Sequence, residues 1–181
     1  LEYIYLILHF PAFKHSHAKG TEQEIDFIVG RKFVITTHYD SIDPLHEFSK
    51  VFEVNSILDK SMLSEHAGYV FYYMISHLYR ALTHELDFVT ASLRAIEDKI
   101  FTGREREMVI SLSNASRTLL EFKQAMDLHH EVLKAFEAAA RKFFGESFEA
   151  PLRAILSEHF KVHGGVRAKL DLGAPFLAST R

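Results

Sequence analysis

Histidine is the residue type in this chain with the widest scope for chemistry. The sequence holds 12 histidines and no cysteine, which excludes disulfides, thiolate zinc sites and cysteine nucleophiles. His159 and His163 are four residues apart, so on a helix both rings leave from one face and can begin a site for zinc, nickel or cobalt. Two ligands alone make no site. The favoured interpretation is therefore that His159 fills an apolar seam and His163 is solvated.

Enzymatic motifs are absent from the sequence. His84-Glu85 begins like the zinc-protease pattern H-E-x-x-H, but Phe88 occupies the position of the second ligand. The chain has neither a G-x-S-x-G turn nor a glycine-rich phosphate loop. Glu97 and Asp98 are adjacent in sequence, so their carboxylates splay apart on a helix. We predict no catalytic residues and no catalytic cofactor.

The remaining histidines and tyrosines have structural interpretations. His129 lies on an apolar helical stripe and is predicted to be a core histidine bonded to a backbone or side-chain partner. His15 and His17 are expected to be exposed polar residues of a loop. Clustered tyrosines near the start of a long helix are predicted to be core and interface aromatics rather than ligands; they are Tyr69, Tyr72 and Tyr73.

Charge and hydropathy bound the possible partners. The net charge is -3 and no Lys/Arg-rich run is present, so a nucleic-acid surface is excluded. A membrane-spanning helix needs roughly 20 apolar residues, and no stretch approaches that length, so the piece itself is expected to be soluble. The opening run Leu1–Phe10 has no basic leader and does not indicate a signal peptide. Both ends look cut, and we expect a longer parent protein.

The first part of the chain has the alternation of β-strands. A β-rich run from Tyr3 to Leu8 ends before Pro11. Two further strands, 24–29 and 32–38, flank Gly30-Arg31, which is predicted to form a tight hairpin turn because glycine tolerates positive φ. Pro44 is placed to open a short helix that runs from Leu45 to about Val54.

From Ser64 onward the apolar period becomes helical. One stripe continues to Ile100, a break is expected at Thr102-Gly103, a second stripe runs over 112–143, and a third runs over 148–170 after a break near Gly145. We therefore predict an α+β fold, in which an α/β/α-like sheet portion precedes long antiparallel helices. The expected divisions are 1–60 for the sheet portion, 61–145 for a helical hairpin and 146–181 for the start of a further long helix.

Several segments together resemble the cytoplasmic domain of the CorA family of magnesium and cobalt channels. Each is similar to a family segment, and their order and spacing match over nearly the whole chain. These segments are Tyr5-Leu-Ile-Leu-His-Phe-Pro11, Val34-Ile-Thr-Thr-His38, Ile96-Glu-Asp-Lys-Ile-Phe101, Leu119-Leu-Glu-Phe-Lys123 and His130-Glu-Val-Leu133.

The resemblance implies a truncated CorA-like cytoplasmic domain that senses intracellular divalent metal and gates transport. Magnesium or cobalt is the implied regulatory ligand, with zinc as an option. Family members are homopentamers, anchored by membrane helices that this chain lacks. The parent protein is accordingly expected in the cell inner membrane, with this domain in the cytoplasm.

The chain also departs from the family pattern. Arg80 stands where an acidic residue of the first long helix is expected, and the N-terminal part of the family domain is absent. Gly164-Gly165 and Gly173-Ala-Pro175 interrupt the third helix, which is expected to be kinked or frayed, since each interior glycine costs about 1 kcal/mol and a proline about 3 kcal/mol.

These departures bear on the metal ligands. Asp171 and Glu158 are the acids nearest to the family's ligand on the long helix, although neither is a residue-by-residue match and each also fits a solvated surface role. Together with His159 and His163 they are the predicted metal residues.

Two other functions remain open. One is the cytoplasmic domain of a zinc-transporting relative in the same superfamily, which the histidine content and the scarcity of acids on the first long helix favour. The other is a soluble helical protein that buffers metals or acts as an adaptor. Only the transporter interpretations require two apolar segments of about 20 residues after Arg181.

Overall fold

The computed structural model describes residues 2–11, 23–39, 41–58, 66–100 and 105–178. Two predicted features lie outside these residues: the loop over 14–20, with its two histidines, and the break at Thr102-Gly103.

Three strands form one antiparallel sheet in the order β1-β2-β3. They are β1 (Tyr3–Phe10), β2 (Gln23–Gly30) and β3 (Val34–Thr37). Every second residue of β1 is buried, which is the alternation of a sheet with one face on a core; these residues are Ile4, Leu6, Leu8 and Phe10. The three predicted strands are confirmed, and β1 continues two residues beyond Leu8.

The hairpin between β2 and β3 is present, but the predicted role of Gly30 is wrong. The backbone N–H of Gly30 donates to the carbonyl of Phe33 at 2.9 Å, so the turn centres on Arg31 and Lys32. Gly30 does not have positive φ. A β-carbon on Gly30 would lie 2.3 Å from Cε1 of Phe33. Glycine lets the Phe33 ring fold back over the backbone, and with any larger residue this ring, which is 45% exposed, would have to move.

In the described part of the chain, four α-helices and one short 3-10 turn follow the sheet. They are α1 (Asp43–Leu58), α2 (Gly68–Ile100), α3 (Glu105–Phe144), η2 (Glu146–Phe148) and α4 (Glu149–Ala178). The first helix was predicted correctly but is four residues longer at its C-terminal end. The break near Gly145 is confirmed, and here a glycine does adopt the left-handed region, with φ of 82°.

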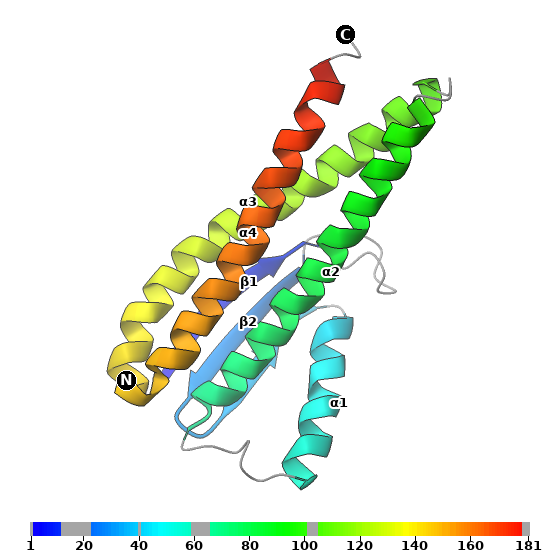
Figure 1. Ribbon diagram of the computed structural model, residues 1–181. Coiled ribbons are helices and arrows are strands. Elements are labelled where there is room, and N and C mark those ends of the chain that lie inside the picture. Colours follow the sequence, from blue (N-terminus) through cyan, green and yellow to red (C-terminus); the bar gives the residue numbers. More distant parts are fainter. Residues whose placement is uncertain (1, 12–22, 40, 59–65, 101–104, 179–181) are drawn as a thin grey trace.

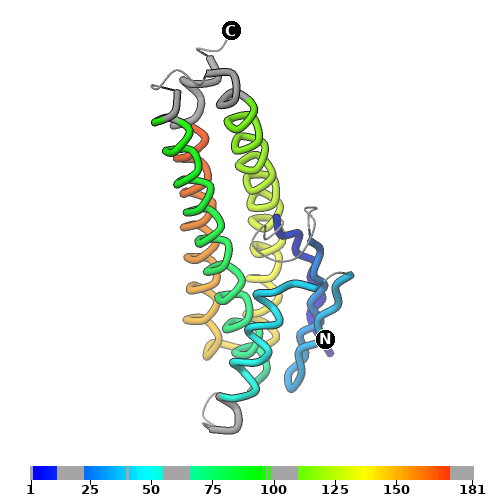
Figure 2. Tube along the Cα trace, turned by 90° about the vertical axis from the view of Figure 1, so that its right-hand side faces the viewer, coloured from blue at the N-terminus to red at the C-terminus, as the bar shows by residue number. Residues whose placement is uncertain are grey.

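The three long helices lie side by side and the sheet packs against one part of them (Figure 1). Helices α2 and α3 run antiparallel, and α4 returns along both of them. Viewed from the side, the sheet covers only the part of the bundle near the turn from α3 to α4, and the helices continue beyond it (Figure 2). Helix α1 packs on α2. The α+β prediction, a small sheet followed by long antiparallel helices, is confirmed.

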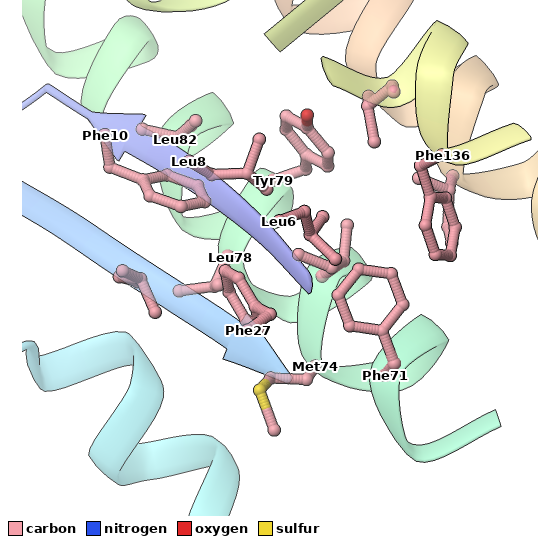
Figure 3. Close-up of a cluster of buried hydrophobic side chains, with 14 of the residues drawn as sticks. Leu6, Leu8, Phe10, Phe27, Phe71, Met74, Leu78, Tyr79, Leu82 and Phe136 are labelled. Carbon is pink, nitrogen blue, oxygen red and sulfur yellow. The ribbon is translucent and has the colours of Figure 1, made fainter. Parts of the chain in front are cut away.

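A continuous apolar core joins the sheet to the helices. Leu6, Leu8 and Phe10 of β1 lie over Tyr79 and Leu82 of α2 (Figure 3). The rings of Phe27 in β2 and Phe71 in α2 meet edge to face with centroids 5.4 Å apart. Full burial of such side chains contributes about 1.5–3 kcal/mol each, so the sheet face and the helical stripes stabilise one another.

Helix α4 is continuous where a kink or fraying was predicted. It runs from Glu149 to Ala178, across Gly164-Gly165 and residues 173–175. A methyl group placed at Gly165 would lie 3.0 Å from Cδ2 of Leu86 in α2. Glycine therefore permits α2 and α4 to approach closely, and packing between the helices offsets its poor helix propensity. Across the described chain, no helix is both long and apolar enough to cross a lipid bilayer.

The two adjacent glycines give a matched test of this packing. A β-carbon added at Gly164 would meet no atom within 4 Å, whereas one at Gly165 would meet Leu86. We expect Gly164→Leu to raise the free energy of unfolding by about 0.5–1 kcal/mol through helix propensity. Gly165→Leu should lower it by about 1–3 kcal/mol through overpacking. Urea unfolding of the two variants measures both, and equal effects would contradict the close approach.

Candidate functional site: histidines between the helices and the sheet

His129 connects three elements of the fold. It projects from α3, is fully buried, and lies with Nδ1 3.0 Å from the Tyr79 hydroxyl of α2. Its Nε2 lies 2.9 Å from the backbone oxygen of His9 in β1. Its ring and that of Phe10 meet in a T-shaped arrangement with centroids 4.8 Å apart. The prediction of a core histidine with a backbone or side-chain partner is confirmed.

These two hydrogen bonds fix the tautomer of His129. A carbonyl oxygen can only accept, so Nε2 carries the hydrogen, and Nδ1 must then accept the Tyr79 hydroxyl hydrogen. The neutral ring is fully satisfied in this state. Burial lowers the pKa of His129 to about 3; the hydrogen bond to the His9 backbone opposes this shift, and the His159 and His9 side chains add to it. Burial raises the pKa of Tyr79, so it favours the neutral form of this side chain as well.

His159 is the second fully buried histidine. Its Nε2 donates to the backbone oxygen of Met126 in α3 at 2.8 Å, while Nδ1 is buried and finds no hydrogen-bond partner among the described residues. Burial lowers the pKa of His159, and the Met126 carbonyl opposes that shift. The seam-filling interpretation of His159 fits this geometry.

His163 lies one turn further along α4 and makes a polar contact with α3. Its Nε2 is 2.9 Å from Oδ1 of Asp127, and Lys123 contacts Oδ2 of the same carboxylate at 2.6 Å. The hydrogen bond from Lys123 is the main reason that the pKa of Asp127 is lowered, and His163 adds to it. The ring of His163 is half-buried, so it is held by Asp127 rather than left free in water.

The histidines of α3 and α4 also touch one another. His159 stacks on His130 with centroids 5.8 Å apart and on His163 with centroids 5.7 Å apart. The Tyr79 ring approaches His159 edge-on at 6.1 Å. His130, His159 and His163 therefore stack in a row where α3 meets α4. The Tyr79 ring of α2 contacts both His159 and His129.

The four predicted metal residues are only partly brought together. His159 and His163 stack, but Glu158 pairs with Lys161 at 2.8 Å. Asp171 is exposed and follows His159 by 12 residues, about 18 Å along a helix. Within the described chain, no three His, Asp or Glu side chains are grouped closely enough to hold a metal ion. The metal-ligand assignment stays a prediction.

Sequence reasoning found the buried histidines but not their partners. Tyr79 belongs to the apolar stripe of α2, and its aromatic ring with a polar tip at a core position was a usable signal. The sequence has no signal for Asp127 or the His9 carbonyl as partners, because hydrogen bonding to either requires contact between elements that are distant in sequence. In the described structure, histidines make several of the polar contacts between elements; His77 on α2 also pairs with Glu47 on α1 at 3.8 Å.

Comparison with known proteins gives one family match. Residues 2–163 match the family model described as CorA-like Mg2+ transporter protein. A search of curated protein sequences gave no match.

Solved structures share the fold at low sequence identity. The soluble domain of CorA from Methanocaldococcus jannaschii superimposes with a TM-score of 0.82 at 15% identity, over 98% of this chain and 69% of that one. The complete CorA magnesium transporter of the same organism gives 0.82 at 14% identity, over 99% of this chain, which spans 55% of that transporter's length. The ZntB cytoplasmic domain from Vibrio parahaemolyticus RIMD 2210633 superimposes with a TM-score of 0.73 at 12% identity. The match covers 98% of this chain and 68% of that domain.

The Tyr79 hydroxyl is the testable element of the buried hydrogen bonds. Tyr79→Phe leaves Nδ1 of His129 buried without its donor, which should lower the free energy of unfolding by about 1–3 kcal/mol. Tyr73→Phe, a half-buried position on the same helix, is the control and should change it by less than about 0.5 kcal/mol. Chemical denaturation measures the difference. Equal stabilities would mean that the hydroxyl contributes nothing.

Proposed function

Because the chain belongs to the CorA-like Mg2+ transporter protein family, we propose that it is the cytoplasmic regulatory domain of a magnesium or cobalt channel. In this role it senses divalent metal inside the cell and gates transport. The match over residues 2–163 is the observation that carries the proposal, and the fold shared with the soluble domain of CorA supports it. Membership of a transporter family confirms both the resemblance drawn from the sequence and the prediction that the chain is not an enzyme.

The proposed setting is a homopentamer in the cell inner membrane, with this domain in the cytoplasm. The chain spans 55% of the length of the complete CorA transporter that it resembles, so the proposal assigns the membrane helices to sequence outside this chain. Metal would act by binding one arrangement of the subunits more tightly than another. A ligand shifts such an equilibrium only through that difference in affinity.

Asp171 and Glu158 are the proposed carboxylate ligands for a hard cation such as magnesium, which prefers oxygen. Asp171 is exposed on α4 and so accessible to a neighbouring subunit, while Glu158 would have to exchange its pairing with Lys161. His159 and His163 are proposed only for a softer ion. Binding at Nε2 would compete with the hydrogen bonds to Met126 and Asp127.

Zinc transport is the second candidate function. Twelve histidines in the chain and an exposed Arg80 on α2 favour an ion with nitrogen ligands over magnesium. The fold shared with the ZntB cytoplasmic domain is compatible with this but does not decide it. A soluble metal-buffering or adaptor protein is the third possibility, and a gene without apolar segments after Arg181 would favour it.

Metal selectivity separates the first two candidates. For the magnesium or cobalt function, we expect calorimetric titration of the purified chain to show binding of magnesium or cobalt that zinc does not outcompete at micromolar concentration. A strong preference for zinc, with no response to millimolar magnesium, would favour the zinc transporter instead.

Asp171 provides the sharper test of metal sensing in the full-length transporter. In liposomes with an entrapped magnesium indicator, Asp171→Asn should raise the internal magnesium concentration that halts influx by roughly fivefold or more, the scale of a typical coupling energy. Asp98→Asn is a matched control, because Asp98 is an exposed carboxylate on α2. Identical inhibition curves for the two variants would remove Asp171 from the regulatory site.

A further inference from the structure

The sheet is attached to α3 through the hydrogen bonds of His129. Protonation of the His129 ring would disrupt one of these bonds. His129 donates to the His9 backbone oxygen and accepts from the Tyr79 hydroxyl. A proton added at Nδ1 would turn this atom into a donor, so the Tyr79 hydroxyl would have to rotate and accept instead of donate. The hydroxyl hydrogen would then lose Nδ1, the acceptor that it has in the buried site. The ring has no solvent exposure through which water can compensate.

The groups that face His129 provide no countercharge. From β1 come the His9 backbone oxygen, the Phe10 ring and the His9 side chain, which is paired with Glu24 of β2 at 3.5 Å. From α2 comes Tyr79, and His159 of α4 acts on the ring electrostatically. On α3 itself, the carboxylate two residues away, Asp127, is engaged by Lys123 and His163. A cationic His129 would therefore be buried among neutral or potentially cationic groups, which is strongly unfavourable.

We propose that docking of the sheet on α3 is proton-linked through His129, so that acid favours a state in which β1 has separated from α3 and the ring is hydrated. The inference rests on the packing of this chain and concerns the chain with no added metal.

The direction of the effect follows from the two protonation equilibria. In the separated state His129 has its ordinary pKa near 6.5, whereas in the docked state burial lowers its pKa to about 3. Above pH 6.5 neither state binds the proton, and the docked state keeps its full stability. As the pH falls below 6.5, only the separated state takes up the proton, so docking is lost progressively. The equilibrium constant for separation rises by up to about tenfold per pH unit.

Hydrogen exchange detected by mass spectrometry tests the proposal on the full chain. Amides of β1 are followed between pH 7.5 and 5, with exchange times corrected for the intrinsic pH dependence. In the native chain, the constant for opening of β1 should rise close to tenfold between pH 6 and 5. In His129→Gln this rise should disappear, because the Gln amide can donate to His9 and accept from Tyr79 but does not titrate in this range.

His130→Gln is the matched control, since His130 is the adjacent, half-buried histidine of the same helix. It should retain the native pH dependence. A pH-independent opening in the native chain, or an unchanged rise in His129→Gln, would overturn the proposal.

A second measurement does not depend on any variant. In the native chain, the carbon-bound ring protons of His129 should keep the chemical shifts of a neutral imidazole from pH 8 to 5 while the chain stays folded. A titration of that ring near pH 6.5 would show that the docked state accepts the proton, and it would equally rule the proposal out.

Discussion

The packing of one face of β1 against α2 and α3 is the constraint on which the rest of the fold depends. The strand has a period of two, so its alternate side chains enter the core together, and a shift of one residue would expose all of them. Its buried residues meet the stripe of α2 that contains Tyr79 and Leu82 (Figure 3). The same contact brings the His9 carbonyl to His129. The register of β1 against the helices therefore determines which of its backbone carbonyls meets His129.

Periodicity made most of the fold predictable, whereas close contacts between elements did not. The strands and the three helical stripes follow from local spacing alone. Gly30 and Gly165 were identified as special positions but explained incorrectly, because a sequence does not show what approaches a missing side chain. At Gly30 the neighbour is the Phe33 ring, and at Gly165 it is Leu86 of another helix. Local propensity predicted a disturbed α4, and tertiary packing overrode it.

The candidate site shows the same division. His129 and His159 were predictable as core histidines because each falls on an apolar stripe. Their partners were not, since the contact of His129 with Tyr79 spans 50 residues and that with the His9 carbonyl spans 120. The pairing of His163 with Asp127 crosses 36 residues. Such partners depend on how the helices align with one another, and a single sequence with only periodic patterns does not specify that alignment.

The unbroken course of α4 has a mechanical consequence. Val166 is the last fully buried side chain described on α4, and from there to Ala178 is 12 residues, or about 18 Å along the axis. A straight helix of that length acts as a lever: tilting it by about 5° at Val166 would move its far end by about 1.6 Å, from the same rise per residue. A kinked rod would absorb the tilt at its bend. Small adjustments at the pivot are thus magnified at the distal tip.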